Sequence, residues 1–268
     1  LALPDRIEAD ETSADILQLI QLEKYFGGLK AVSGFSLNLK SGELKGLIGP
    51  NGAGKSTVFN LISGLYRPTG GRVLLDSEDI TGRKPDFVAG KRVARTFQTV
   101  KLLANRSVLE TMMTAFFAAY DYNLLSAILQ TRRYRRQEKE LEQQAIQYLA
   151  KLGVDHLKDE YSDELPYGLQ RKVSIAAALC LNPRVLMLDE PMAGLTHPEK
   201  DELSDIVLKL RQEYQLSIIL VEHDMKVIMN LCDSIAVMNN GTLIAEGSSE
   251  EIRHDPEVIR AYLGKSTV

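Results

Sequence analysis

Short apolar runs alternate with polar and glycine-containing segments at the start of the chain. The runs cover residues 16–22, 35–39 and 44–48, and they are separated by Gly27-Gly28 and Ser41-Gly42. Runs of this length between turn-forming residues are typical of β-strands. The pattern therefore predicts a small strand-rich lobe.

The spacing of the apolar residues changes after Gly49. Helical spacing covers residues 55–65, a short strand pattern follows at 72–75, and helical spacing dominates from 108 to 153. The last of these segments is a candidate for a helical insertion.

From Gly168 onward, helical stretches alternate with short runs that contain almost only apolar residues. These runs lie at residues 185–188, 217–221 and 234–238. Strands that are covered by helices on both faces have this character. The pattern predicts a parallel α/β sheet for this part of the chain.

The composition is that of an ordinary folded protein. Of the 268 residues, 44% are hydrophobic and 25% are charged, which excludes extensive disorder and fibrous repeats. The 32 basic and 36 acidic residues give a net charge of −4, so we expect no nucleic acid as a partner. Cys180 and Cys232 lack the spacing of a zinc site or a disulfide framework, and we expect a reducing compartment.

The termini and the apolar stretches predict no membrane span and no secretory signal. A span requires about 18 uninterrupted apolar residues, and the richest stretch, residues 112–130, contains Asp121 and Asn123. Residues 1–15 lack a basic region followed by an apolar one. We expect a flexible tail at 1–15, one domain over 16–264 and a short tail at 265–268.

A glycine-rich segment, residues 49–56, directly follows the apolar run at 44–48. Its sequence, Gly-Pro-Asn-Gly-Ala-Gly-Lys-Ser, fits the phosphate-binding pattern GxxxxGK followed by Ser or Thr, between a strand and a helix. Glycine lets backbone N–H groups curl around phosphate oxygens, and the helix N-terminus adds a positive dipole end. A glycine-rich turn without a ligand would explain the glycines but not the Lys-Ser pair.

The polar residues of this phosphate-binding segment have distinct expected roles. Lys55 neutralises the β- and γ-phosphates, the Ser56 hydroxyl binds Mg²⁺, and Thr57 reaches the α-phosphate. The predicted nucleotide site comprises Gly49, Asn51, Gly52, Ala53, Gly54, Lys55, Ser56 and Thr57.

Two acidic residues follow the apolar run at 185–188. The carboxyl end of a parallel strand is where α/β sheets place their sites. There Asp189 suits the outer coordination sphere of Mg²⁺, and Glu190 suits a general base that deprotonates water. An Asp-Glu pair is also a common helix N-cap, but the phosphate-binding segment upstream favours the catalytic interpretation.

His223 follows the apolar run at 217–221. A histidine at a strand end is often only a polar surface residue. Because parallel strands bring their carboxyl ends to one edge of the sheet, we expect Ser56, Asp189, Glu190 and His223 to face one γ-phosphate.

The segment Leu165-Pro166-Tyr167-Gly168-Leu169-Gln170-Arg171 precedes small residues with helical spacing at 173–181. With this signature-like segment the chain resembles an ABC-transporter nucleotide-binding subunit, whose signature LSGGQ is usually followed by Gln and Arg. Pro166 replaces the signature serine and Leu169 its glutamine. The resemblance implies that Leu165, Pro166, Tyr167 and Gly168 meet the γ-phosphate held by a partner subunit.

Further segments match the family pattern in order along the chain. Gln98, in Arg95-Thr96-Phe97-Gln98, is similar to the Q-loop glutamine that senses Mg²⁺ and the γ-phosphate, and His223 is similar to the switch histidine. Residues 193–196, Ala-Gly-Leu-Thr, resemble the D-loop, with Thr where Asp or Asn is usual. Phe26 matches the aromatic residue that stacks on adenine; the alternatives are Tyr25 in that role or a core aromatic of the strand.

The resemblance implies a fold and a reaction. The expected fold is α/β: a P-loop NTPase (RecA-like) core with an antiparallel β-lobe and a helical ABC subdomain at about 100–167. The expected reaction is Mg-dependent ATP hydrolysis, with ATP and Mg²⁺ as cofactors, by a head-to-tail dimer of two ATPase subunits that are identical or different. Glu190, His223 and Gln98 are then catalytic, while Ser56, Gln98 and Asp189 hold Mg²⁺.

Several segments are similar to the ATPase subunits of branched-chain amino-acid importers. They are Phe26-Gly27-Gly28-Leu29, Arg95-Thr96-Phe97-Gln98, Tyr167-Gly168 and Arg260-Ala261-Tyr262-Leu263-Gly264. Related urea importers and lipopolysaccharide exporters share part of this set. The resemblance implies transmembrane permease subunits, a solute-binding protein acting through the complex, and a peripheral place at the cytoplasmic face of the cell membrane.

Two other functions stay open at this point. A soluble ABC ATPase that remodels nucleic-acid or ribosomal complexes would usually carry a second cassette or a coiled-coil or zinc insertion, which this sequence lacks. A nucleotide-binding module without hydrolysis would not need the lysine, the two acids and the histidine of the predicted site.

Overall fold

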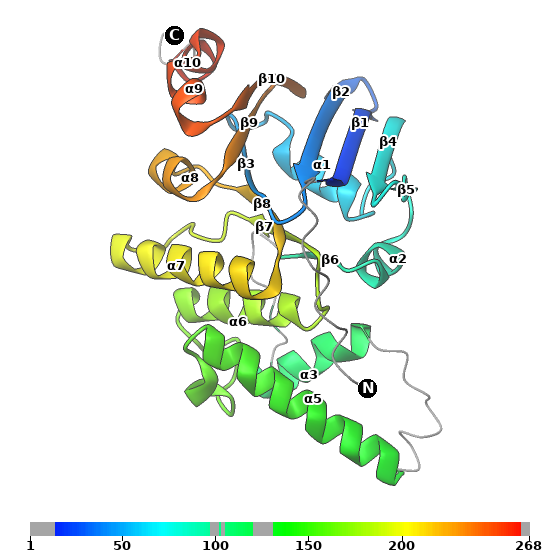
Figure 1. Cartoon of the computed structure of the whole chain (residues 1–268), viewed down its shortest axis with the longest axis vertical. Coiled ribbons are helices and arrows are strands. Elements are labelled where there is room, and N and C mark those ends of the chain that lie inside the picture. Colours follow the sequence, from blue (N-terminus) through cyan, green and yellow to red (C-terminus); the bar gives the residue numbers. More distant parts are fainter. Residues whose placement is uncertain (1–13, 97–101, 103–104, 120–130, 264–268) are drawn as a thin grey trace.

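Two sheets occupy the upper part of the molecule and a group of helices the lower part (Figure 1). This computed structural model describes residues 14–96, 102, 105–119 and 131–263. The residues outside these ranges include Gln98 and residues 120–130. They also include both predicted tails, except for Ala14 and Asp15.

The smaller sheet is antiparallel, with the strand order β2-β1-β4-β5. Its strands are β1 (Asp15–Phe26), β2 (Leu29–Lys40), β4 (Gly70–Leu75) and β5 (Glu78–Asp79). The predicted strand-rich lobe is confirmed, but β1 and β2 are longer than the apolar runs. Their extra residues include the hairpin around Gly27-Gly28. Apart from the buried Val32 they are half-buried or exposed, so that no apolar run marks them.

The larger sheet has the order β10-β9-β3-β8-β7-β6, and all of its strands are parallel except β10 at the edge. Its strands are β3 (Leu44–Ile48), β6 (Val93–Arg95), β7 (Val185–Asp189), β8 (Ser217–Val221), β9 (Ser234–Asn239) and β10 (Thr242–Gly247). Every residue of β3, β7 and β8 is buried. The predicted parallel α/β sheet is therefore confirmed.

Helices flank this sheet and extend below it (Figure 1). They are α1 (Lys55–Ile62), α2 (Pro85–Gly90), α3 (Val108–Ala119), α5 (Arg132–Lys151), the 3-10 helix η1 (Asp155–Leu157), α6 (Tyr167–Leu179), α7 (His197–Tyr214), α8 (Met225–Leu231), α9 (Ser249–His254) and α10 (Pro256–Leu263). The predicted helical segment 108–153 thus contains α3 and α5, which pack on each other and on α6. Within the described ranges, no helix has the length and apolar character needed to cross a membrane.

Two predicted helix boundaries are wrong. Helix α6 begins at Tyr167 rather than at residue 173, because Pro166 supplies an extended start (φ −51°, ψ 145°) and its carbonyl oxygen accepts from the Gln170 N–H at 3.0 Å. Helix α1 ends at Ile62 rather than at residue 65, where Ser63 and Gly64 (φ +75°) turn the chain away. Within the signature-like segment, residues 167–171 therefore lie in α6, whereas Leu165 and Pro166 precede the helix.

The packing of α3 on α5 provides a test of the helical region. Phe116 on α3 is 1% exposed, and its ring stacks on Tyr148 of α5 with 6.2 Å between ring centroids. Replacing Phe116 with Ala leaves a cavity, so we expect Phe116→Ala to lower the free energy of unfolding by about 3–5 kcal/mol. Urea denaturation measures this change. Tyr161→Ala, at a side chain that is 53% exposed, should change it by only ~0.5 kcal/mol; equal effects of the two substitutions would contradict the assigned packing.

Candidate functional site

A cavity of about 740 Å³ opens beside the phosphate-binding segment at the carboxyl end of β3. Its walls come from the β1–β2 hairpin, from the start of α1, and from the residues that follow β7, β8 and β9. The lining residues are Phe26, Leu29, Lys30, Ala31, Asn51, Gly52, Ala53, Gly54, Lys55, Ser56, Thr57, Glu190, His223 and Asn240. Of the four residues expected to share one site, Ser56, Glu190 and His223 thus line one cavity, whereas Asp189 does not line it.

The phosphate-binding segment is held tightly between two other strands. A Cβ at Gly49 (φ +150°) would lie 2.1 Å from the carbonyl oxygen of Met238 in β9. A Cβ at Gly54 (φ +107°) would lie 2.6 Å from the carbonyl oxygen of Ala31 in β2. Glycine is therefore required at both positions for space as well as for backbone conformation. Gly49 itself is buried and does not line the cavity.

Lys55 begins α1 and points into the curve of this segment. Its Nζ donates hydrogen bonds to the carbonyl oxygens of Gly49 (2.7 Å) and Pro50 (3.2 Å), and the residue is 6% exposed. Burial lowers the pKa of Lys55, while the nearby carboxylates of Glu190 and Asp189 raise it. The ammonium thus stands between the loop carbonyls and two acidic groups.

Glu190 and His223 form a close pair at the ends of neighbouring strands. His223 Nε2 lies 2.5 Å from Glu190 Oε1, and since a carboxylate only accepts, the imidazole donates. Glu190 is 8% exposed and has a left-handed backbone (φ +48°), while its N–H donates to the Val221 carbonyl at 2.9 Å. The sheet therefore holds the backbone of Glu190 in a sparsely populated conformation, which fixes its carboxylate at the cavity wall.

Asp189 lies behind the cavity and is 2% exposed. Its Oδ2 accepts from Arg95 Nη2 at 2.8 Å, while Oδ1 is buried and has no hydrogen-bond partner among the described residues. A buried carboxylate oxygen without a donor is the kind of group that Mg²⁺, or a water bound to it, satisfies. Ser56 lines the cavity and is exposed, so the side chains present fit a magnesium ion.

Phe26 is 41% exposed and lines the cavity, whereas Tyr25 does not line it. Its ring makes an edge contact with Tyr66, with 5.3 Å between the centroids, and the Lys24 Nζ lies 5.0 Å from its centroid. Because the Phe26 side chain is exposed, it is not a core aromatic of strand β1, which was the alternative interpretation. Phe26 therefore offers an aromatic surface at the mouth of the cavity.

The signature-like segment does not line this cavity. Pro166 is exposed and precedes α6, while the Tyr167 ring is 43% exposed and its hydroxyl accepts from Arg171 Nη2 at 2.5 Å. A Cβ at Gly194, in the D-loop-like segment, would lie 3.4 Å from the Tyr167 ring. Thr196 of that segment caps α7, together with Glu199 in a capping box.

Two further charged residues beside the site, Glu222 and Arg95, have no role predicted from the sequence. Glu222 is 4% exposed and accepts from the N–H groups of Met192 (2.7 Å) and His223 (3.2 Å). Burial raises the pKa of Glu222, and these two donors oppose that rise. Both residues stand at the carboxyl end of a parallel strand, which is the same positional signal that identified Asp189 and Glu190.

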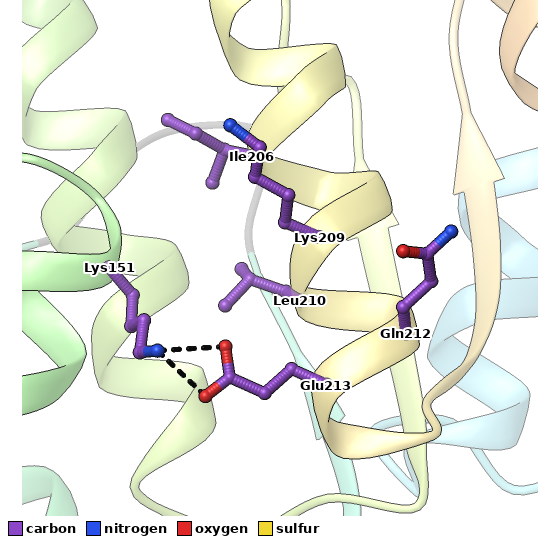
Figure 2. A pocket seen from close by; sticks show the side chains of 6 residues that line it. All are labelled: Lys151, Ile206, Lys209, Leu210, Gln212 and Glu213. Atoms are coloured by element: carbon purple, nitrogen blue, oxygen red, sulfur yellow. Dashed lines mark hydrogen bonds and ion pairs between the residues drawn. The ribbon is translucent and has the colours of Figure 1, made fainter.

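A second cavity, of about 460 Å³, lies between the end of α5 and α7 (Figure 2). Its charged residues include Lys151 and Glu213, which form an ion pair at 2.8 Å. No residue of the predicted site lines it. The cavity at the phosphate-binding segment is therefore the candidate functional site.

The order of these parts along the chain defines a class of protein. Strand β3 is followed by the phosphate-binding glycine loop and by helix α1. Further along the chain, β7 leads into the Asp-Glu pair, and its neighbour β8 ends shortly before a histidine. These three strands run parallel in one sheet. Together with the antiparallel lobe and the helical region, this is the architecture of an ATP-binding cassette.

Comparison with known proteins agrees with this assignment. The family model described as ABC transporter matches residues 32–193, and that of the branched-chain amino acid ATP-binding cassette transporter matches residues 242–267. BraF of Pseudomonas aeruginosa and LivG of Escherichia coli K12, both named high-affinity branched-chain amino acid transport ATP-binding proteins, are each 41% identical to this chain over 254 residues, which is 95% of this chain and 100% of each relative.

Solved structures lead to the same family. A nucleotide-free ATP-binding cassette of an ABC transporter superimposes with a TM-score of 0.82 at 33% identity, covering 93% of this chain and 99% of the other. A structure of an ATP-binding cassette of an ABC transporter in its ADP conformation gives a TM-score of 0.80 at 32% identity, covering 94% of this chain and 99% of the other. The chain belongs to the family of ABC-transporter ATP-binding subunits that includes BraF and LivG, and it is an ATPase. The predicted family, fold and enzyme class are confirmed.

The position of Lys55 generates a binding test. Lys55→Ala removes the cation that lies inside the loop, so we expect the affinity for Mg-ATP to fall by roughly 10- to 100-fold, the scale of one or two charge-assisted hydrogen bonds. Titration with a fluorescent ATP analogue measures it. Lys45→Met is the matched control, because Lys45 is also buried in this sheet but pairs with Glu246 at 2.5 Å; it should leave the affinity unchanged. Equal affinities of the Lys55→Ala and wild-type chains would contradict the assignment of the phosphate site.

Proposed function

We propose that this chain hydrolyses Mg-ATP at the cavity of the phosphate-binding segment and thereby powers an importer of branched-chain or other hydrophobic amino acids. The observation that carries the chemistry is the contact between Glu190 and His223 beside Lys55. The observation that supports the solute is the match over the whole length of BraF and LivG, whose names state branched-chain amino-acid transport.

The proposed reaction assigns a task to each residue at the cavity. The N–H groups of the phosphate-binding segment and Lys55 hold the β- and γ-phosphates. Glu190 takes a proton from the attacking water while the water oxygen bonds to the γ-phosphorus. The bond between the γ-phosphorus and the oxygen that bridges the β- and γ-phosphates breaks at the same time and releases ADP. His223 donates to Glu190 Oε1 and so orients the base.

Mg²⁺ is the proposed metal cofactor. Ser56 and Asp189 would hold it, together with Gln98, which lies outside the described residues. When bound, the ion neutralises charge on the phosphate oxygens. Phe26 would stack on the adenine, because its exposed ring stands at the mouth of the same cavity.

The site is proposed to be completed by a second ATPase subunit. Leu165, Pro166, Tyr167 and Gly168 stand at the start of α6 and do not line their own chain's cavity, which supports their placement against the γ-phosphate of a partner. Pro166 offers neither a hydroxyl nor an N–H, so the backbone at Gly168 and the helix dipole carry this contact. The partner is a second copy of this chain or a related subunit.

The remaining partners follow from the importer. Transmembrane permease subunits would bind this chain at the cytoplasmic face of the membrane, and a solute-binding protein would act through the complex. The family of ABC-transporter ATP-binding subunits supports the permease partner, and the names of BraF and LivG support the class of solute.

Glu190→Gln separates binding from hydrolysis. Glutamine keeps the shape of the side chain but no longer acts as a base, so we expect ATP binding to be retained and turnover to fall roughly 100-fold or more. Because the bound ATP is not consumed, size-exclusion chromatography with Mg-ATP should show a stabilised dimer. Glu213→Gln, in the second cavity, should behave as the wild type. Wild-type turnover in the Glu190→Gln variant would remove Glu190 as the base.

Reconstitution tests the transport function. The chain, purified with its native permease subunits and solute-binding protein in liposomes, should show ATPase activity that rises several-fold with leucine, isoleucine or valine. Lys55→Ala in the same complex should abolish the rise. Stimulation by urea alone would assign the chain to a urea importer, and activity that requires no solute would overturn the importer function.

A further inference from the structure

Arg95 forms a buried connection between three elements behind the cavity. It is the last residue of β6 and pairs in register with Met187 of β7. Its Nη2 lies 2.8 Å from Asp189 Oδ2, with the two side chains 8% and 3% exposed. At this depth an ion pair is weakly screened and strongly dependent on geometry.

The other edge of the same guanidinium contacts α1. Nη1 donates to Asn60 Oδ1 at 2.6 Å and to Ser63 Oγ at 3.3 Å, and the guanidinium carbon lies 5.4 Å from the centroid of the Phe59 ring. Helix α1 is the helix that begins at Lys55. Arg95 therefore ties the Asp189 carboxylate to the helix that starts in the phosphate-binding segment.

This connection leaves the two oxygens of Asp189 in different situations. Oδ2 is held by Arg95, whereas Oδ1 is buried without a hydrogen-bond partner in the described part of the chain. Because a carboxylate is planar and rigid, fixing Oδ2 also fixes the direction in which Oδ1 points. Leaving such an oxygen unpaired costs free energy, which a cation or a metal-bound water would recover.

We propose that Arg95 is a positioning residue for the magnesium site: it holds Asp189 by Oδ2 and so presents Oδ1 to the ion or to its bound water. This inference rests on the proposed Mg-ATP site. It explains why an arginine stands here, since its planar fork spans Asp189 on one side and Asn60 with Ser63 on the other. A lysine ammonium on a flexible stem would keep the charge but not span all three.

The simplest alternative is an ion pair that only stabilises the fold. A purely structural pair would change nucleotide affinity equally with and without Mg²⁺. A positioning residue changes only the gain in affinity that the metal provides. The informative quantity is therefore the ratio of the dissociation constants for ATP measured in EDTA and in Mg²⁺, which we call the metal enhancement.

The experiment measures the metal enhancement by titrating the full chain with a fluorescent ATP analogue. Loss of a partner that orients a metal ligand typically lowers metal affinity 10- to 100-fold, so Arg95→Lys should lower the enhancement roughly 10-fold while the affinity in EDTA stays within about 2-fold. Asp189→Asn should lower it similarly. Arg95→Lys combined with Asp189→Asn should lower it no further than Asp189→Asn alone, because both act through one carboxylate.

Arg92→Met is the matched control, because Arg92 lies just before β6, is exposed, and donates to Asn182 instead. It should keep the wild-type enhancement. An unchanged enhancement in Arg95→Lys, or an equal loss of affinity in EDTA and in Mg²⁺, would overturn the positioning role alone. A wild-type chain that does not bind ATP would overturn the proposed function and this inference with it.

Discussion

The enclosure of the phosphate-binding segment by backbone from two other strands is the constraint on which the site depends. The carbonyl oxygens of Met238 and Ala31 lie where side chains at Gly49 and Gly54 would stand. The segment passes close to both carbonyl groups, and Lys55, the first residue of α1, points back into the loop and donates to the Gly49 carbonyl. The position of β3 between β8 and β9 makes this enclosure possible, because β9 reaches the segment from one side.

Buried charge is balanced pair by pair around this segment. Lys55 lies near the carboxylates of Glu190 and Asp189, Asp189 is paired with Arg95, and Glu190 is paired with His223. A buried charge without a partner would cost several kcal/mol, so these groups depend on one another.

The signature-like segment and the D-loop-like segment lie against each other within this chain. The Tyr167 ring lies against Gly194, and Thr196 caps α7 through its side chain and Glu199. Threonine accepts backbone N–H groups much as the more usual Asp or Asn does, which gives a structural reason for its place here. The start of α6 and the D-loop-like segment therefore lie side by side.

The sequence by itself determined the elements and the residues whose pattern is local. The strand, glycine loop and helix around Lys55, and the acidic end of β7, are set by neighbouring residues, so periodicity and spacing identified them. The tertiary structure alone decided that β3 lies between β8 and β9, that Phe26 is exposed at a cavity, and that Arg95 holds Asp189. These facts depend on pairing between segments far apart in the chain, and no local pattern encodes which distant backbone or side chain will be the partner.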